Sequence, residues 1–511
     1  MIPIIKQQAH RIALIFILLA LLIHAFYFER IKALGGFGYD GLFYGDYAKY
    51  FIQYIKNNYI DSYHFQRVGI PFIIHYAFLF FKIEYTNPNI IHAFTFVNLS
   101  FIFFAIAYYF LISKTLILSR NIEIIGFASL FYCFPVLKLC LYCPVLMDIP
   151  AFCLSVILVY HYLKNNILSY FILLLIGSFI YPTFVLLSVL FFFKKQDLNI
   201  QTEELPKSNK IGTFFKRFNI SHFLFCYSFS ILLCVIYIVL FWHSSLELMA
   251  RDYNGRPYAT VLIWVSFFIA LSYLSYLNYF PKFVFNIKRI FKSINIYGVI
   301  LVITLIVLTK TIVNFYSSKG EPAFTLQSFL YNIIYQAVKN PFNFMIAHIF
   351  YFGFAPLLAF FLIKDLKREI SAFGMSMILF FNLFVFFSVG SESRQLLNYY
   401  PFFILLLVII LDKFWKVSLT FTILYTIMCI ALSHFWYKIN TATNLSNQLV
   451  DLHPFEFPDQ RYFMFQGPWV SDLMYKIHIA ICIIILLLFW IAFKKTKLIV
   501  RKDENPLQNN K

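Results

Sequence analysis

The sequence predicts an all-α membrane protein, a polytopic transmembrane helical bundle of about 12–14 spans. Of its 511 residues, 61% are hydrophobic and 13% are charged, whereas a soluble domain carries about 25% charged residues. Apolar runs of roughly 20 residues recur along the chain, and each can cross a hydrocarbon core of about 30 Å. Lysines and arginines gather in short clusters between these runs, as in the cytoplasmic loops of membrane proteins.

The apolar runs divide the chain into about fourteen expected crossings. In order they are 11–28, 91–113, 122–141, 149–163, 168–180, 183–193, 221–242, 260–280, 295–315, 342–363, 371–389, 395–411, 417–436 and 473–493. The basic clusters after alternate runs mark the inner side and place both termini in the cytoplasm. No small-residue cleavage site follows the first run, so we expect an uncleaved span rather than a signal peptide.

The first outer loop, 29–90, is expected to contain two interfacial helices. In 46–57 the apolar side chains recur with the spacing of one helix face, and Asp46 and Lys49 fall on the other face. Such a helix lies flat at the membrane surface. The second helix, 68–81, is apolar but too short to cross, at about 14 residues.

The expected organisation has four parts and no internal repeat. These are an N-terminal module (1–193), a basic cytoplasmic loop (194–220), further transmembrane helices with outer loops 316–341 and 437–472 (221–493), and a basic cytoplasmic tail (494–511). The formal charge of +19 fits the positive-inside pattern. It therefore does not indicate a nucleic-acid partner.

Asp40 is the first candidate for chemistry. It lies between Gly38 and Gly41 in an aromatic stretch about a dozen residues after the first span. The glycines let a ligand approach the backbone, and a carboxylate at the lipid–water boundary is suited to act as a general base. The alternative interpretation is an ordinary Asp-Gly turn.

Asp148 is the second acidic candidate, at the outer end of a span and flanked by Pro144 and Pro150. The predicted topology puts it on the same face of the membrane as Asp40. An aspartate here is also a good helix cap, so a purely structural role stays open.

Arg67, Glu392 and Arg394 complete the candidate outer site. Arginine binds phosphate through two parallel hydrogen bonds. Glu392 and Arg394 could instead pair with each other. Arg67 could instead snorkel, with its aliphatic part in the apolar region and its charged group at the membrane surface.

No residue pattern indicates a cofactor or a metal. The 12 histidines show no metal-ligand spacing and no nucleotide-binding glycine motif is present, although a divalent metal stays open. Cys140 and Cys143 have CxxC spacing, which we interpret as packing because no partner pair or thioredoxin-like context accompanies them.

Three stretches resemble the GT-C superfamily of integral-membrane glycosyltransferases, including its mannosyltransferase-like bacterial members. They are GYDGLFY at 38–44 followed by RVGIP at 67–71, MDIPA at 147–151, and ESRQLL at 392–397. The first is similar to the first outer loop of bacterial members, the second to a second acidic position, and the third to a later E-x-R-x-LL segment. The expected pair of interfacial helices also matches the layout of the family.

The resemblance implies an inverting hexosyltransferase in a bacterial inner membrane. It would move a sugar from a polyprenyl-phosphate donor to a glycan, lipid or protein acceptor at the outer face. Asp40 would be the base and Asp148 would orient the acceptor, while Arg67 and Arg394 would bind the donor phosphate. Supporting roles are expected for Tyr39, Tyr44, Asp46 and Glu392.

Two departures from the family pattern concern the basic groups. Gln66 precedes Arg67 where the family often has a second basic residue or a His-Pro-Pro, and Tyr181 stands before Pro182 where it often has an arginine. The alternatives are a flippase or transporter for lipid-linked saccharide, which would need charges within its spans, an O-antigen polymerase or ligase with a key arginine such as Arg461 in a late outer loop, or a degenerate member of the GT-C superfamily without activity.

Overall fold

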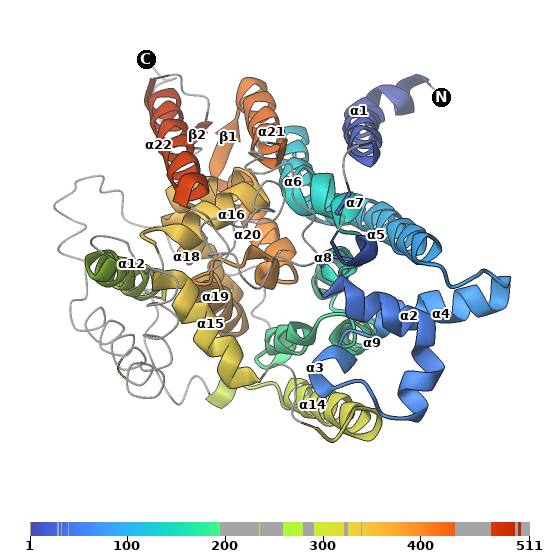
Figure 1. The fold of residues 1–511 in the computed structure, drawn as a ribbon. Coiled ribbons are helices and arrows are strands. Elements are labelled where there is room, and N and C mark those ends of the chain that lie inside the picture. The colour runs from blue at the N-terminus through green and yellow to red at the C-terminus, as the bar shows by residue number, and fades with distance from the viewer. Residues whose placement is uncertain are drawn as a thin grey trace, which may run out of the picture.

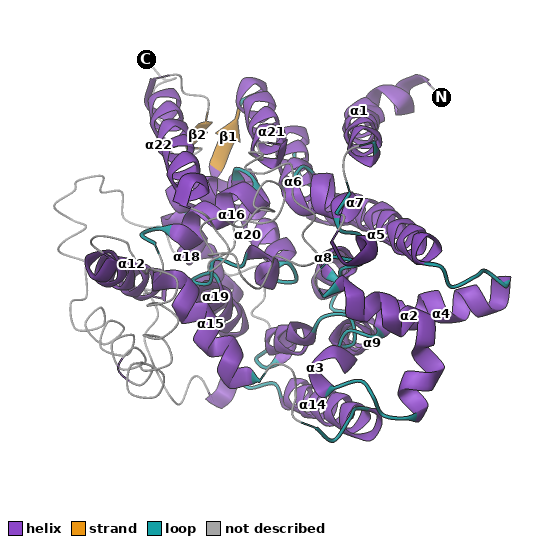
Figure 2. Ribbon diagram, viewed as in Figure 1, coloured by secondary structure: helices purple, strands orange, loops and turns teal. Residues whose placement is uncertain are grey.

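Most of the described residues of the computed structural model are in helices, in agreement with the all-α prediction (Figure 2). The structure describes residues 2–27, 30, 31, 33–38, 40–194, 235, 259–278, 291–320, 325–338, 340–434, 472–495 and 499–501. With η marking a 3-10 or π segment, the first elements are α1 (Ile2–Phe26), η1 (Ala33–Gly36), α2 (Gly41–Lys56), α3 (Ser62–Phe65), α4 (Gly69–Phe81), α5 (Asn87–Leu116), α6 (Arg120–Phe131), η2 (Pro135–Leu139), α7 (Cys140–Tyr142), α8 (Asp148–Leu163), α9 (Ile167–Ser178) and η3 (Pro182–Phe191). The later elements are α12 (Ala259–Asn278), α14 (Ile296–Tyr316), α15 (Leu326–Val338), α16 (Asn343–Phe352), α17 (Ala355–Phe361), α18 (Ile363–Phe373), α19 (Met375–Phe387), η4 (Ser393–Leu396), α20 (Tyr400–Phe414), β1 (Trp415–Val417), α21 (Leu419–His434), α22 (Asp472–Lys495) and β2 (Ile499–Arg501).

Several of these helices could span a membrane. By length and composition four described helices qualify, and a fifth is added if one bent pair is counted as a span. The four are Gln8–Phe26, Asn87–Leu116, Val261–Asn278 and Ile296–Tyr316. The other apolar helices have 10–17 residues. The count of about fourteen crossings stays a prediction. Three expected segments lie outside the described residues, namely the basic loop 194–220 apart from Lys194, the span at 221–242 apart from position 235, and the outer loop 437–472 with Arg461, apart from Asp472.

Breaks in the expected spans follow from proline and glycine. The run at 122–141 is bent by 51° between α6 and the segment Pro135–Tyr142, because proline cannot donate the backbone hydrogen bond that would continue the helix. The run at 342–363 divides into α16 and α17 around Gly353. The short run at 183–193 forms the 3-10 segment η3 rather than an α-helix.

Two helices and a pair of strands were not expected from the sequence. Helix α15 lies within the expected outer loop 316–341, and α18 occupies the expected inner cluster of basic residues. Gly374 separates α18 from α19 with a φ of 95°, which glycine adopts without steric penalty. Strands β1 and β2 pair antiparallel, Trp415 opposite Arg501, and form the two-stranded sheet of the described residues.

The N-terminal half packs as a layer of helices around α5. Helix α5 lies along α8, and α2 lies along α4 at the edge of the molecule (Figure 1). The backbone N–H of Gly69, at the start of α4, donates to the carbonyl of Phe179 at 2.8 Å. A Cβ at Gly69 would lie 3.0 Å from that oxygen, so any larger residue would force the two segments apart by a few tenths of an ångström. This contact joins the first outer segment to the α9–η3 turn.

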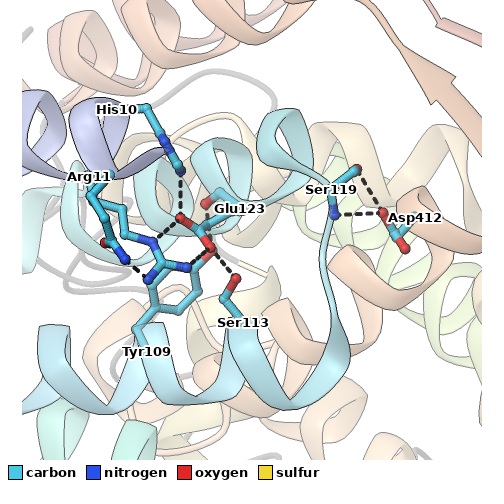
Figure 3. Close-up of polar contacts among 8 residues, drawn as sticks. His10, Arg11, Tyr109, Ser113, Ser119, Glu123 and Asp412 are labelled. Carbon is cyan, nitrogen blue, oxygen red and sulfur yellow. Dashed lines mark hydrogen bonds and ion pairs between the residues drawn. The ribbon is translucent and has the colours of Figure 1, made fainter. Parts of the chain in front are cut away.

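A buried carboxylate fixes α1 to the rest of the fold. Glu123 accepts hydrogen bonds from Arg11 Nε and Nη2, both at 2.7 Å, and lies 2.8 Å from His10 Nε2 (Figure 3). The hydroxyl of Ser113 also donates to Glu123, and Tyr109 OH donates to its main-chain carbonyl at 2.5 Å. Because both oxygens have partners and the group is buried, removing a partner would leave an uncompensated charge.

Candidate active site

A cavity of about 1110 Å³ collects the sequence-predicted site residues. Its walls come from the start of α2, the turn that contains α3, the start of α8, the α9–η3 turn, α14, α15 and η4. The predicted residues that line it are Asp40, Tyr44, Arg67, Asp148, Glu392 and Arg394. Asp46 is not among the lining residues, because it lies farther along α2, and Tyr39 lies outside the described residues.

Asp40 precedes the first turn of α2 without capping it. Its side chain makes no cap hydrogen bond to the helix, so the carboxylate is not engaged as in an Asx turn. One carboxylate oxygen instead lies 3.5 Å from Arg394 Nη2. The side chain is about one-third exposed, which leaves it accessible to a ligand in the cavity.

Asp148 is buried at the start of α8, before the span expected at 149–163. Met147 is the N-cap residue and makes no side-chain cap bond. Within the described structure, Asp148 Oδ1 is buried and has no hydrogen-bond partner. Burial raises the pKa of Asp148 to about 6, because removal from water disfavours the charged form. An unpartnered buried carboxylate oxygen is suited to accept a hydrogen bond from a bound ligand.

Arg394 and Glu392 form an ion pair, which was one of the two roles that the sequence allowed for them. Arg394 Nε donates to Glu392 Oε1 at 2.5 Å, and Gln395 Nε2 donates to Glu392 Oε2 at 2.7 Å. Burial alone would lower the pKa of Arg394, but Glu392, Asp40 and Asp148 outweigh it and hold that pKa well above its ordinary value. The guanidinium is therefore permanently charged and faces carboxylates.

The η4 segment that carries Arg394 is held by a buried histidine. His348 Nδ1 lies 2.9 Å from Ser393 Oγ, and His348 Nε2 lies 2.7 Å from the carbonyl of Ser388. A carbonyl only accepts, so Nε2 donates to it and Nδ1 accepts from the serine hydroxyl. These bonds fix the backbone on both sides of Glu392.

Arg67 is held by aromatic rings. Its guanidinium carbon lies 3.9 Å from the centre of the Tyr63 ring and 5.6 Å from that of Tyr181, and Nη1 donates to the carbonyl of Tyr63 at 2.9 Å. Tyr181 OH donates to the carbonyl of Arg394 at 3.2 Å. Tyr181 therefore connects the two arginine segments.

Sequence reasoning missed two polar features, the Asp61–His64 pair, of which His64 lines the cavity, and Lys310. Asp61 caps α3 through the N–H groups of Tyr63 and His64, and it also pairs with the His64 ring. Burial opposes ionisation, but the hydrogen bonds from His64 and Tyr63 outweigh it and lower the pKa of Asp61. The Asp-x-x-His spacing three residues before Arg67 was the available signal. Lys310, inside the apolar run of α14, also lines the cavity.

The described residues include no group of three or more His, Cys, Asp and Glu side chains that could hold a metal ion. Comparison with protein-family models, with curated proteins and with solved structures finds no match to this chain. The arrangement of the site therefore carries the functional argument. It combines two carboxylates, one of them uncapped and accessible, with arginines in a cavity large enough for a sugar and its phosphate.

Proposed function

We propose that this protein is an integral-membrane glycosyltransferase of the GT-C type, which transfers a sugar from a polyprenyl phosphate to an acceptor at the outer membrane face. The observation that carries the proposal is the meeting of Asp40, Asp148 and Arg67 in one cavity, although they lie far apart in the sequence. A nucleophilic displacement at a sugar needs a base, a cation for the leaving phosphate and a group that orients the acceptor.

In the proposed reaction the acceptor hydroxyl attacks the anomeric carbon. Asp40 accepts the hydroxyl proton while the bond from that carbon to the phosphate oxygen breaks. The electron pair of this bond goes to the lipid phosphate, whose charge nearby cations stabilise. Asp148 accepts a hydrogen bond from the acceptor. A single displacement of this kind inverts the anomeric carbon.

The first outer segment fits an interfacial position in this proposal. Helix α4 carries large apolar side chains that the rest of the protein leaves exposed, namely Phe72, Ile73, Tyr76, Leu79, Phe80 and Phe81. A surface of this kind is stable when it contacts lipid. The segment would place the cavity at the lipid–water boundary, where a polyprenyl chain remains in the bilayer while its phosphate reaches the site.

The test is transfer of radiolabelled sugar from polyprenyl-phosphate donors, in membranes that contain equal amounts of each variant. We expect Asp40→Asn to reduce the rate by about 10²–10⁴-fold. The matched control is Glu84→Gln, which removes an exposed carboxylate of the same outer segment and leaves the rate unchanged. Transfer by Asp40→Asn at the wild-type rate would refute the assignment of the base. Absence of transfer together with faster movement of lipid-linked saccharide across the bilayer would favour a flippase.

A further inference from the structure

The cations of the cavity differ in whether a carboxylate neutralises them. Arg394 lies 2.5 Å from Glu392 and 3.5 Å from Asp40. One guanidinium therefore faces two carboxylates, and the Arg394 group brings no net positive charge for a ligand. A phosphate placed on Arg394 would also meet the repulsion of these carboxylates.

Arg67 and Lys310 are the uncompensated cations of the cavity. Neither makes an ion pair within the part of the chain that the structure describes. Arg67 packs its guanidinium face on the Tyr63 ring and uses one N–H on the Tyr63 carbonyl. The other N–H groups of Arg67 remain available for an anion, since the guanidinium has five.

The position of Lys310 needs an explanation beyond folding. It lies in α14, one of the helices that are long and apolar enough to cross a membrane. A lysine inside such a segment is costly and commonly marks a ligand or ion site. The face of α14 toward the cavity is made by residues three and four apart, as a helix requires. These residues are Ile306, Thr309, Lys310, Val313 and Asn314.

The α9–η3 turn contacts both the segment that carries Arg67 and the helix that carries Lys310. Ser178 Oγ lies 3.3 Å from the hydroxyl of Thr309, the neighbour of Lys310. Three residues later, the Tyr181 ring lies under the Arg67 guanidinium. The C-terminal end of α14 also contacts the segment that carries Arg67. The rings of Phe65 and Tyr316 stack there with centres 6.1 Å apart.

We infer that Arg67 and Lys310 form an anion subsite for the phosphate group of a ligand, and that Arg394 is a positioning residue for Asp40 and Glu392. A phosphate monoester, such as the lipid phosphate that the proposed transfer releases, carries up to two negative charges, which these two cations match. Arginine supplies directed hydrogen bonds and lysine a mobile point charge. The identity of this phosphate as that of a lipid-linked donor rests on the proposed function, whereas the subsite itself does not.

Binding of tritiated farnesyl phosphate to the full-length protein in nanodiscs tests the subsite without any need for transfer. Loss of one charge-assisted contact is expected to weaken binding by about tenfold or more in Arg67→Gln and in Lys310→Gln. Lys310→Arg keeps the charge and should bind as wild type. The matched control is Lys319→Gln, an exposed lysine just after α14 that does not line the cavity.

Two competitors identify the source of the phosphate. Farnesol has no charge and should not displace the probe. Displacement by inorganic phosphate at low millimolar concentration would identify a site for the free ion, and no displacement would identify a lipid headgroup site. Unchanged farnesyl phosphate affinity in both glutamine variants would refute the subsite, even if transfer still depends on Asp40. Intact binding without any sugar transfer would refute the proposed function and leave the subsite standing.

The positioning role of Arg394 has its own readout. Arg394→Gln should keep the affinity for farnesyl phosphate within about twofold, because Arg67 and Lys310 are intact. In the transfer assay the same variant should lower kcat and leave the KM for the donor unchanged, and Arg394→Lys should restore part of kcat. A loss of farnesyl phosphate binding in Arg394→Gln that matches the loss in Lys310→Gln would contradict this role.

Discussion

Replacement of Asp148 by asparagine should stabilise the protein at neutral pH. Burial raises the pKa of Asp148 from 3.8 to about 6, so the folded state binds its proton more tightly than the unfolded state. The stability that this tighter binding provides is complete below pH 3.8 and is lost as pH rises through about 6. A difference of roughly 2 units corresponds to about 3 kcal/mol, which the ionised carboxylate costs the folded wild type at pH 8. Asparagine has no charge to bury.

The assay is thermal unfolding in nanodiscs, followed by tryptophan fluorescence at pH 4 and at pH 8. At pH 8 Asp148→Asn should raise Tm by a few degrees. At pH 4 the difference in unfolding free energy should fall below about 1 kcal/mol, since folded Asp148 is then protonated. Glu84→Gln, at an exposed position, should show no such pH-dependent difference. An equal Tm shift at both pH values would refute the reasoning, because a packing effect does not titrate.

Three further outcomes follow from the same contacts. The transfer rate of wild type should fall as pH drops below about 6, because protonated Asp148 no longer offers a charged acceptor; the fall should be absent in Asp148→Asn. Glu123→Gln should lower stability by about 3 kcal/mol, since Arg11 loses its buried partner, and a Tm equal to that of wild type would contradict this. Gly69→Val should lower the free energy of unfolding by about 1–3 kcal/mol through overpacking against Phe179. A Tm equal to that of wild type would show that the α9–η3 turn moves to accommodate the valine at no cost.

The helices of the first outer segment were predictable from side-chain spacing. The pattern in 46–57 and the apolar run at 68–81 led to helices that the structure has as α2 and α4. Both signals are local, because the repeat of a helix face is set by its own residues. The breaks of the longer runs were predictable only in part. Pro135 marks one in the sequence, but a single glycine such as Gly374 is tolerated inside helices and does not by itself predict a break.

The composition of the cavity was predictable, but the distribution of charge within it was not. The motifs identified Asp40, Arg67 and Arg394, which the fold brings together. That Arg394 faces two carboxylates is a result of tertiary distances. For the same reason the position of Lys310 in the cavity was not predictable from the sequence. No local spacing connects it to Arg67, since the link passes through Tyr181 and Thr309.

The small antiparallel ladder between β1 and β2 restricts the path of the chain across a bilayer. Because Lys416 and Val500 are paired, residues 416 and 500 lie at the same depth, and the chain between them must cross an even number of times or not at all. The bridge between Phe193 and Ile294 places these two residues at one depth in the same way. The hydroxyl of Ser119 donates a hydrogen bond to Asp412 Oδ1 at 2.7 Å. Ser119 therefore lies at the same depth as the C-terminal end of α20. Whatever the total number of crossings, Lys416 and Val500 therefore lie on the same side of any membrane that the chain spans.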